Sequence, residues 1–307
     1  DAAQTLSQRV LLNMLKQRQQ GQAMEVSEGF VTAFKNALLD DASDKALIAE
    51  VLTLPSESYL GDQMSVVDVD GLFAARQMLK QRVTESLYDD LMRVYENNRE
   101  SGDYSIHPDD IARRSLKNAA LSYLVSLQRD DARELCLEQY KAGHNMTDVM
   151  AAFSLIADSD FADRNEILKD FEQRWSHDPL VMDKWFTAQA VSRREDTLSC
   201  VKQLMQHELF SIKNPNKVRS LIGAFCSGNP VRFHQVDGLG YTFLADSVIQ
   251  LNALNPQVAA RMLRIISRWS RYDEKRQQLM KQQLERIVAS EGISRDVYEI
   301  AAKSLEA

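Results

Sequence analysis

Glycine and proline are scarce in this chain, at 11 and 6 of its 307 residues. Both are about half as frequent as in an average protein. An all-β protein needs many tight turns, which these two residues make, so their scarcity favours helices. Hydrophobic residues make up 44% of the chain and charged residues 26%. This balance is typical of a folded globular protein and excludes a disordered one.

Long apolar runs, an excess of positive charge and paired cysteines are also missing. No segment reaches the roughly 20 apolar residues that span a bilayer, so we expect no membrane partner. The net charge is −7, which gives no overall basic surface for a nucleic acid. Cys136, Cys200 and Cys226 are odd in number and far apart. They predict buried free thiols in a reducing compartment, and not a disulfide framework.

Apolar residues recur at helical spacing through nearly the whole chain. Phe30, Phe34 and Leu38, for example, follow one another at intervals of four residues. Ser43 is the predicted cap of a helix that starts at Lys45. The predicted helices cover residues 3–15, 27–39, 45–53, 71–95, 132–140, 147–157, 164–175, 179–190 and 197–207, and one more begins at Pro108.

Three Asn-Pro pairs mark helix starts in the last third of the chain, at Asn214, Asn229 and Asn255. The first and third lie 41 residues apart, within the ~40–47-residue period of HEAT and armadillo helix pairs. Connections are short, and no composition change marks a domain boundary. We therefore predict one all-α domain over residues 1–307, an α-solenoid or superhelix of short antiparallel helix pairs of the HEAT/armadillo type.

Motifs for catalysis or metal binding are missing. The five histidines are scattered, and His207-Glu208 begins like a zinc helix but lacks the second histidine one turn later. Gly238-Leu239-Gly240 has no preceding strand and too few glycines for a dinucleotide site. We predict no catalytic residue, no metal ligand and no cofactor in this chain.

One charged pattern stands out in the last third: Arg261, Arg264, Arg268 and Arg271 recur at spacings of 3, 4 and 3. Met262 and Trp269 lie opposite this pattern on the helix that Pro256 begins, and Gln257 lies one turn before it. Such a face suits an anion or a carboxylate terminus, because guanidinium binds carboxylate through two parallel hydrogen bonds. An exposed basic face without a ligand is the alternative, and the lone Arg219 has the same two interpretations.

Six stretches of this sequence occur in the order of one known family. They are Leu52-Thr53-Leu54-Pro55-Ser56, Asn145-Met146-Thr147-Asp148, Val181-Met182-Asp183-Lys184-Trp185-Phe186, Asn214-Pro215-Asn216-Lys217-Val218-Arg219-Ser220-Leu221-Ile222-Gly223-Ala224-Phe225, Asn255-Pro256-Gln257-Val258-Ala259-Ala260-Arg261 and Arg271-Tyr272-Asp273-x-Lys275-Arg276-Gln277. The series resembles bacterial aminopeptidase N, the zinc alanyl aminopeptidases. The resemblance covers essentially the whole chain, but only the C-terminal helical domain of those enzymes.

The family's catalytic motifs, Gly-x-Met-Glu-Asn and His-Glu-x-x-His, do not occur here. The nearest stretch, Gly21-Gln22-Ala23-Met24-Glu25-Val26, has an extra residue after the glycine and Val in place of Asn. The resemblance therefore implies that zinc is held in an upstream catalytic domain and that this chain alone is inactive. The chain starts at Asp1 without a Met, from which we expect a fragment of a longer enzyme.

The resemblance also implies a role for this domain. It would close over the catalytic domain, enclose an internal cavity and control the entry of peptides, in the cytoplasm. Arg219 and Arg261 correspond to family arginines that project toward the substrate, and Gln257 to a neighbouring polar contact, whereas Arg264 and Arg271 are expected to be solvated. The implied partners are peptide substrates and the enzyme's own catalytic and N-terminal domains. The alternatives are a free-standing α-solenoid scaffold that binds another protein, and an enzyme complete in these residues.

Overall fold

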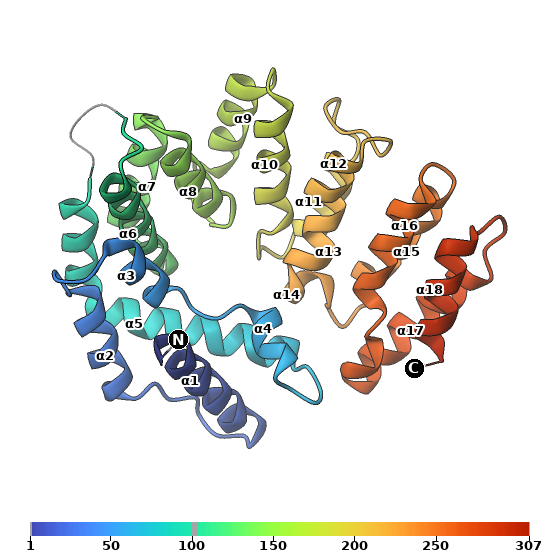
Figure 1. Ribbon diagram of the computed structural model, residues 1–307, viewed down its shortest axis with the longest axis horizontal. Coiled ribbons are helices and arrows are strands. Elements are labelled where there is room, and N and C mark those ends of the chain that lie inside the picture. Colours follow the sequence, from blue (N-terminus) through green and yellow to red (C-terminus); the bar gives the residue numbers. More distant parts are fainter. Residues whose placement is uncertain (1, 100–103, 307) are drawn as a thin grey trace. The chain divides into compact units, whose positions relative to one another are not determined.

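The computed structural model describes residues 2–99 and 104–306, so Asp1 lies outside the described residues. The described residues form helices joined by short connections, and no strand occurs among them (Figure 1). The all-α prediction is thus confirmed. Contacts divide the chain into two compact units, one of residues 1–60 and 70–167 and one of residues 61–69 and 168–307. One domain over residues 1–307 stays a prediction.

The first unit is a succession of helices that pack on near neighbours along the chain. α2 packs on α3, α6 packs on α7 and α8, and α7 packs on α8, while α3 reaches α6. The elements are α1 (Ala2–Gln19), α2 (Glu28–Leu38), α3 (Lys45–Leu52), α4 (Glu57–Asp62), α5 (Val69–Asn97), α6 (Pro108–Leu124), the 3-10 turn η1 (Val125–Leu127), α7 (Asp130–Ala142), α8 (Met146–Ala157) and the start of α9 (Arg164–Trp175).

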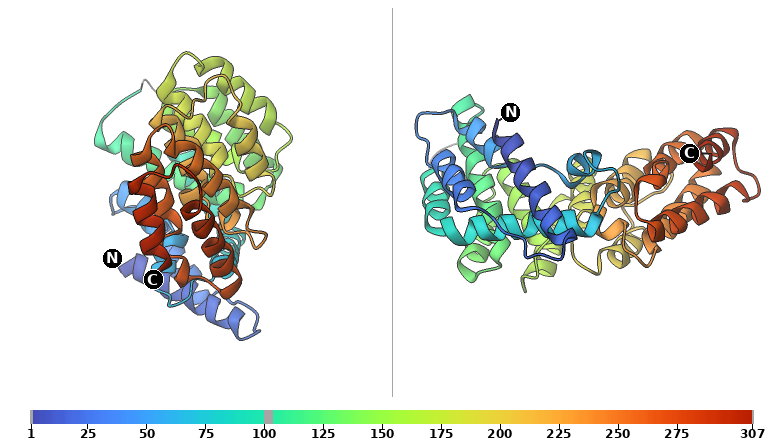
Figure 2. Two further views of the ribbon diagram at one scale, coloured as in Figure 1. Left: turned by 90° about the vertical axis from the view of Figure 1, so that its right-hand side faces the viewer. Right: turned by 90° about the horizontal axis from the view of Figure 1, so that it is seen from below.

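The second unit repeats this packing more regularly. α15 packs on α16 and α17, and α16 and α17 both pack on α18, which Figure 2 shows in red beside α17. Contacts of each helix with the next two are typical of armadillo-type repeats. The elements are α10 (Pro179–Ala190), α11 (Thr197–Leu204), α12 (Pro215–Val218), η2 (Arg219–Gly223), α13 (Ala224–Gly228), α14 (Pro230–Phe233), α15 (Leu239–Asn252), α16 (Pro256–Leu263), η3 (Arg264–Ile266), η4 (Trp269–Arg271), α17 (Glu274–Val288) and α18 (Arg295–Leu305).

Helix starts mostly follow the signals in the sequence. The Ser27 hydroxyl caps α2, as its position predicts. The prediction that Ser43 caps α3 is wrong: the Asp44 carboxylate accepts the N–H of Ala46 at 2.8 Å, and Ser43 instead donates to Asp40 at 2.6 Å. A carboxylate is the stronger acceptor for the free N–H groups of a first turn, and Asp44 is the residue directly before the helix.

The three Asn-Pro pairs do not all work in the same way. The side chains of Asn214 and Asn255 each accept a first-turn N–H, at 2.9 and 3.2 Å, as predicted. Asn229 does not cap its helix. Its Nδ2 donates to the carbonyls of Ala190 and Ser192, at 3.1 and 2.6 Å. Asn229 therefore joins α14 to the end of α10, a partner 37 to 39 residues away that local sequence does not reveal.

The cluster Gly238-Leu239-Gly240 starts α15. Gly238 has φ +72°, the left-handed region that glycine adopts readily. A Cβ on Gly240 would lie 2.1 Å from the carbonyl oxygen of Phe233, so no side chain fits there. Both glycines thus serve the packing of α15 on the chain before it.

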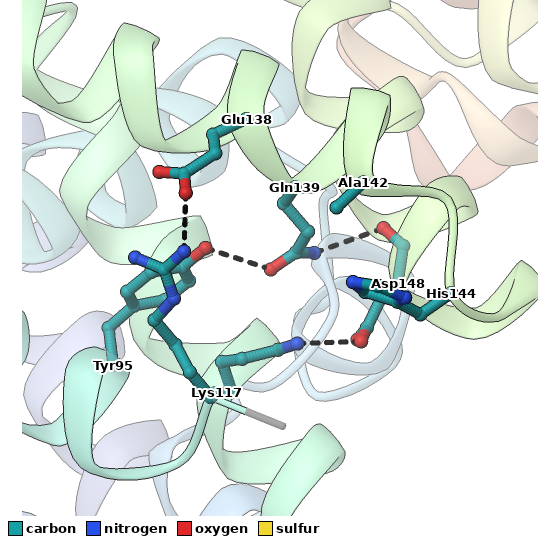
Figure 3. Close-up of a pocket in the computed structure, with 8 residues that line it drawn as sticks. Tyr95, Lys117, Glu138, Gln139, Ala142, His144 and Asp148 are labelled. Atoms are coloured by element: carbon teal, nitrogen blue, oxygen red, sulfur yellow. Dashed lines mark hydrogen bonds and ion pairs between the residues drawn. The ribbon is translucent and has the colours of Figure 1, made fainter. Parts of the chain in front are cut away.

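A buried ion pair joins helices of the first unit. Lys117 on α6 contacts Asp148 on α8 at 2.6 Å, and both side chains are less than a tenth exposed. Asn118 donates to the other carboxylate oxygen at 2.9 Å, and Asn145 donates to the same oxygen as Lys117, also at 2.9 Å. Figure 3 shows Gln139 beside this pair, where its amide donates to the backbone oxygen of Asp148. The Asn145–Asp148 motif therefore holds the unit together.

The cysteines form no disulfide among the described residues. Cys136 and Cys226 are buried, as predicted, and Cys200 is only partly so. Burial raises the pKa of the Cys136 thiol to about 12, so this thiol stays protonated and unreactive near neutral pH.

Candidate functional site

The stretch 214–225 folds as a helix whose middle is one π turn. α12 ends at Val218, η2 is a π-helix, and α13 continues from Ala224. Single π turns inside α-helices are frequent at functional sites because they widen the helix and change the direction of its side chains. The π turn begins at Arg219, whose side chain is exposed.

Three contacts anchor this π turn to α10. Lys217 Nζ lies 2.7 Å from Asp183 Oδ1, and the lysine side chain is 8% exposed. The same ammonium donates to the carbonyl of Pro179 at 3.0 Å. The Thr187 hydroxyl donates to the carbonyl of Ser220, at 2.9 Å, so a backbone group within the π turn has a partner. The motif residues that precede and follow Arg219 therefore fix the backbone from which it projects.

Arg219 and α16 lie next to each other in the second unit. A Cβ placed on Gly223 would be 3.9 Å from Arg219 Cγ and 3.8 Å from the sulfur of Met262. Met262 directly follows Arg261 on α16, which packs on α15 in Figure 1. The two arginines that the sequence proposes as site residues thus project from elements that meet at Gly223.

The predicted site residues differ in their partners. Arg219 donates through Nη2 to Oδ1 of Asn216, a neutral amide. Gln257, Arg261 and Arg264 are exposed, and within residues 2–99 and 104–306 the side chains of Arg261 and Arg264 form no hydrogen bond or ion pair. No carboxylate of the described residues therefore neutralises Arg219 or Arg261.

The prediction that four arginines line one face of a continuous helix is wrong. α16 ends at Leu263, and two 3-10 turns follow. Arg268 and Arg271 turn to Asp62, at 3.3 and 3.1 Å, and Arg271 also donates to the carbonyl of Gly61 at 3.0 Å. The prediction that Arg271 is solvated is also wrong. Residues 61–69 are far from Arg271 in sequence but pack within this unit, and they supply its partners.

Most exposed arginines elsewhere in the described chain meet a carboxylate. Arg82, for example, lies 2.7 Å from Glu28, and Arg129 lies 3.0 Å from Asp131. The chain has 44 acidic residues against 37 basic ones, so carboxylates are not in short supply. Like Arg9, Arg18 and Arg264, Arg219 and Arg261 form no ion pair within the described residues, and their uncompensated charge suits an anionic ligand.

His207, the first residue of the stretch that resembles the start of a zinc-binding helix, makes structural contacts. His207 Nε2 lies 2.9 Å from the Glu172 carboxylate, and its Nδ1 accepts the N–H of Leu209 at 3.1 Å. Its ring packs against Trp185, 5.3 Å between centroids. Among the described residues, no group of three or more His, Cys, Asp or Glu side chains could hold a metal ion.

His234 is buried as a neutral ring. It stacks on Tyr272 at 4.4 Å, and its Nδ1 lies 2.9 Å from the hydroxyl of Tyr241. Burial, helped by the positive charge of Arg276 and opposed by Asp273, lowers the pKa of His234 from 6.5 to about 3. The unfolded chain therefore binds a proton at this residue between these two values, whereas the folded chain does not.

Acid should weaken the fold through His234. Because the folded pKa is depressed, the stabilisation is present above pH 6.5 and falls by about 1.4 kcal/mol per pH unit as the pH drops toward 3. Urea unfolding of the chain at pH 7.5 and 5.5 measures this loss, and His234→Gln should show a flatter dependence by roughly 1 kcal/mol. An equal pH dependence in both proteins would contradict the assignment.

Fold and candidate site together define an armadillo-type repeat domain with two arginines in its second unit that no carboxylate of the described residues neutralises. Comparison with known families gives the same class, since residues 1–306 match the family described as "Domain of unknown function (DUF3458_C) ARM repeats". The chain belongs to this family. No helix of the described residues has both the length and the apolar character to cross a membrane.

Aminopeptidases are among the individual relatives of this chain. The chain is 41% identical over 306 residues to aminopeptidase N of Haemophilus influenzae and 38% identical over 305 residues to that of Escherichia coli, matching 100% and 99% of this chain. A crystal structure of Legionella pneumophila aminopeptidase A in complex with aspartic acid superposes with a TM-score of 0.90 and 30% identity, over 99% of this chain and 36% of that one. The resemblance to aminopeptidase N is confirmed. The chain spans about a third of the length of these curated relatives, 35% in each.

Proposed function

We propose that this chain is the C-terminal domain of a cytoplasmic zinc aminopeptidase that removes N-terminal residues from peptides. It closes over the catalytic domain, encloses the substrate cavity and limits which peptides enter. Support comes from identity of 36–41% to aminopeptidases N along the whole chain, which matches only 35% of each. Its partners are accordingly the catalytic and N-terminal domains of the same enzyme, and peptides.

Zinc belongs to another domain in this proposal. A catalytic zinc needs three protein ligands around one open position, and no such group occurs within the described residues. The closest candidate, His207, already uses both ring nitrogens for Glu172 and Leu209. The donor set of the described residues therefore does not fit the metal, and in this proposal the chain by itself is inactive.

The arginines give the domain a direct part in substrate binding. Arg219, Arg261 and the neighbouring Gln257 bind the far end of a short peptide, whose free carboxylate pairs with guanidinium. The observation that carries this assignment is the lack of a carboxylate partner for Arg219 and Arg261 in the described chain. Contacts remote from the reacting bond raise affinity and orient the substrate without taking part in the chemistry.

Arg261→Ala in the full-length enzyme should separate peptides from amides. We expect kcat/KM for a tripeptide to fall about tenfold, because a hydrogen-bonded charge contributes roughly 1.5 kcal/mol or more. Hydrolysis of an alanine anilide, which has no carboxylate, should hardly change. Arg264→Ala is the matched control and should leave both substrates unaffected. Equal losses on the tripeptide and the anilide for Arg261→Ala would refute carboxylate binding.

A further inference from the structure

Asn216 is the residue that holds the Arg219 side chain. We propose that Asn216 determines the preference for substrates with a free carboxylate, because its neutral amide aims the guanidinium without cancelling its charge. The inference rests on the function proposed above and adds to it a residue that touches the arginine and not the substrate. It makes Asn216 a positioning residue.

The backbone of Asn216 is held at both of its polar groups. Its backbone N–H donates to Oδ1 of Asn214 at 2.9 Å, and its carbonyl accepts the N–H of Arg219. The next residue, Lys217, is buried against Asp183 and the carbonyl of Pro179. One turn of helix thus separates the backbones from which the amide and the guanidinium extend, and the exposed guanidinium has N–H groups beyond the one that Asn216 accepts.

The same geometry occurs elsewhere in the chain with an acid in place of the amide. An acidic residue precedes its arginine by three positions in each of these pairs; Asp90 and Asp110 lie within helices, and Asp273 is the N-cap residue of α17. The chain therefore has a regular way to neutralise such an arginine, and only the substitution of Asn for Asp separates Arg219 from it. The pairs are Asp90–Arg93 at 2.6 Å, Asp110–Arg113 at 3.7 Å and Asp273–Arg276 at 2.8 Å.

Helix electrostatics also favour an acid at this position. Asn216 is the second residue of α12, where a negative side chain would interact favourably with the helix dipole. Both local rules thus predict Asp, and the chain has Asn. Departures from local rules without a gain in stability are expected where function requires them. The gain here is an arginine that is held in place and still fully charged toward a carboxylate.

The test replaces the amide by a carboxylate. In full-length Asn216→Asp, KM for trialanine should rise about three- to tenfold, because the new charge competes with the substrate for Arg219. The kcat value for trialanine should stay the same, as should KM and kcat for trialanine amide. The melting temperature should stay the same or rise, since Asp suits the first turn. Asn165→Asp makes the same charge change at another amide that accepts from an arginine, Arg164, and should change neither substrate.

The variant Arg219→Ala separates the two levels of the proposal. If Arg219→Ala raises KM for trialanine only and Asn216→Asp does not, Asn216 has no part in specificity and the proposed function stands. If Arg219→Ala leaves both substrates unchanged, the role of Arg219 fails and the inference fails with it. A fall of kcat on both substrates in Asn216→Asp would mean a structural role, and would also overturn the inference.

Discussion

Gly240→Ala is expected to lower the free energy of unfolding by more than about 3 kcal/mol. A methyl group there would lie 2.1 Å from the carbonyl oxygen of Phe233 and 2.9 Å from its carbon. Backbone atoms cannot rotate away as a flexible side chain does, so α15 would have to move off the end of α14. Urea unfolding of the chain, followed by circular dichroism, measures the loss.

Gly223→Ala is the matched control. A Cβ at this position meets its nearest atom, the carbonyl oxygen of Val218, at 3.6 Å, which is ordinary contact distance. Alanine is also the better helix former by roughly 0.5–1 kcal/mol, so this variant should be as stable as the original or slightly more so. A Gly240→Ala protein as stable as Gly223→Ala would show that α15 does not approach Phe233 so closely.

Lys117→Met should destabilise the chain by about 3–5 kcal/mol, because it leaves the buried Asp148 carboxylate without its counter-charge. Both side chains are less than a tenth exposed, so water compensates the carboxylate poorly once the ammonium is gone. The amides of Asn118 and Asn145 remain but carry no charge. The free energy of unfolding in urea is the measurement.

Two further variants show whether the loss arises from an unpaired charge. Lys303→Met removes an ion pair with Glu299 on the surface, where such pairs contribute at most about 1 kcal/mol, and should change stability little. Lys117→Met combined with Asp148→Leu removes both charges and should recover part of the lost stability. Additive losses from the two buried substitutions would argue against a mutual pair.

Much of the helical framework can be predicted from the sequence. The Pro108 start, the Asn214 and Asn255 caps and the limits of α9 and α10 all follow from local signals, since a helix begins where its first free N–H groups find an acceptor. Ser43 shows the limit of such signals, because two neighbouring residues could each cap α3 and only their geometry decides between them.

The roles of the candidate site residues stay predictions. Arg219, Gln257 and Arg261 came from spacing and from the family resemblance, and the structure leaves all three exposed. Asn216 was missed, although its position three residues before Arg219 was a usable signal. Several of the family motifs are held by buried contacts between helices, as Lys217 is by Asp183, so their presence in the sequence supports the family more directly than it supports any one substrate contact.

The sequence by itself determined that the chain is helical, where most helices start and that it carries arginines without matching carboxylates close by in sequence. These are local properties, set by residues within one or two turns of each other. Only the tertiary structure decided which arginines stay uncompensated: Arg271 finds Asp62 in a segment some 200 residues earlier, whereas Arg219 and Arg261 find no carboxylate in the described chain. Coulomb attraction depends on distance in space, and the fold alone sets that distance.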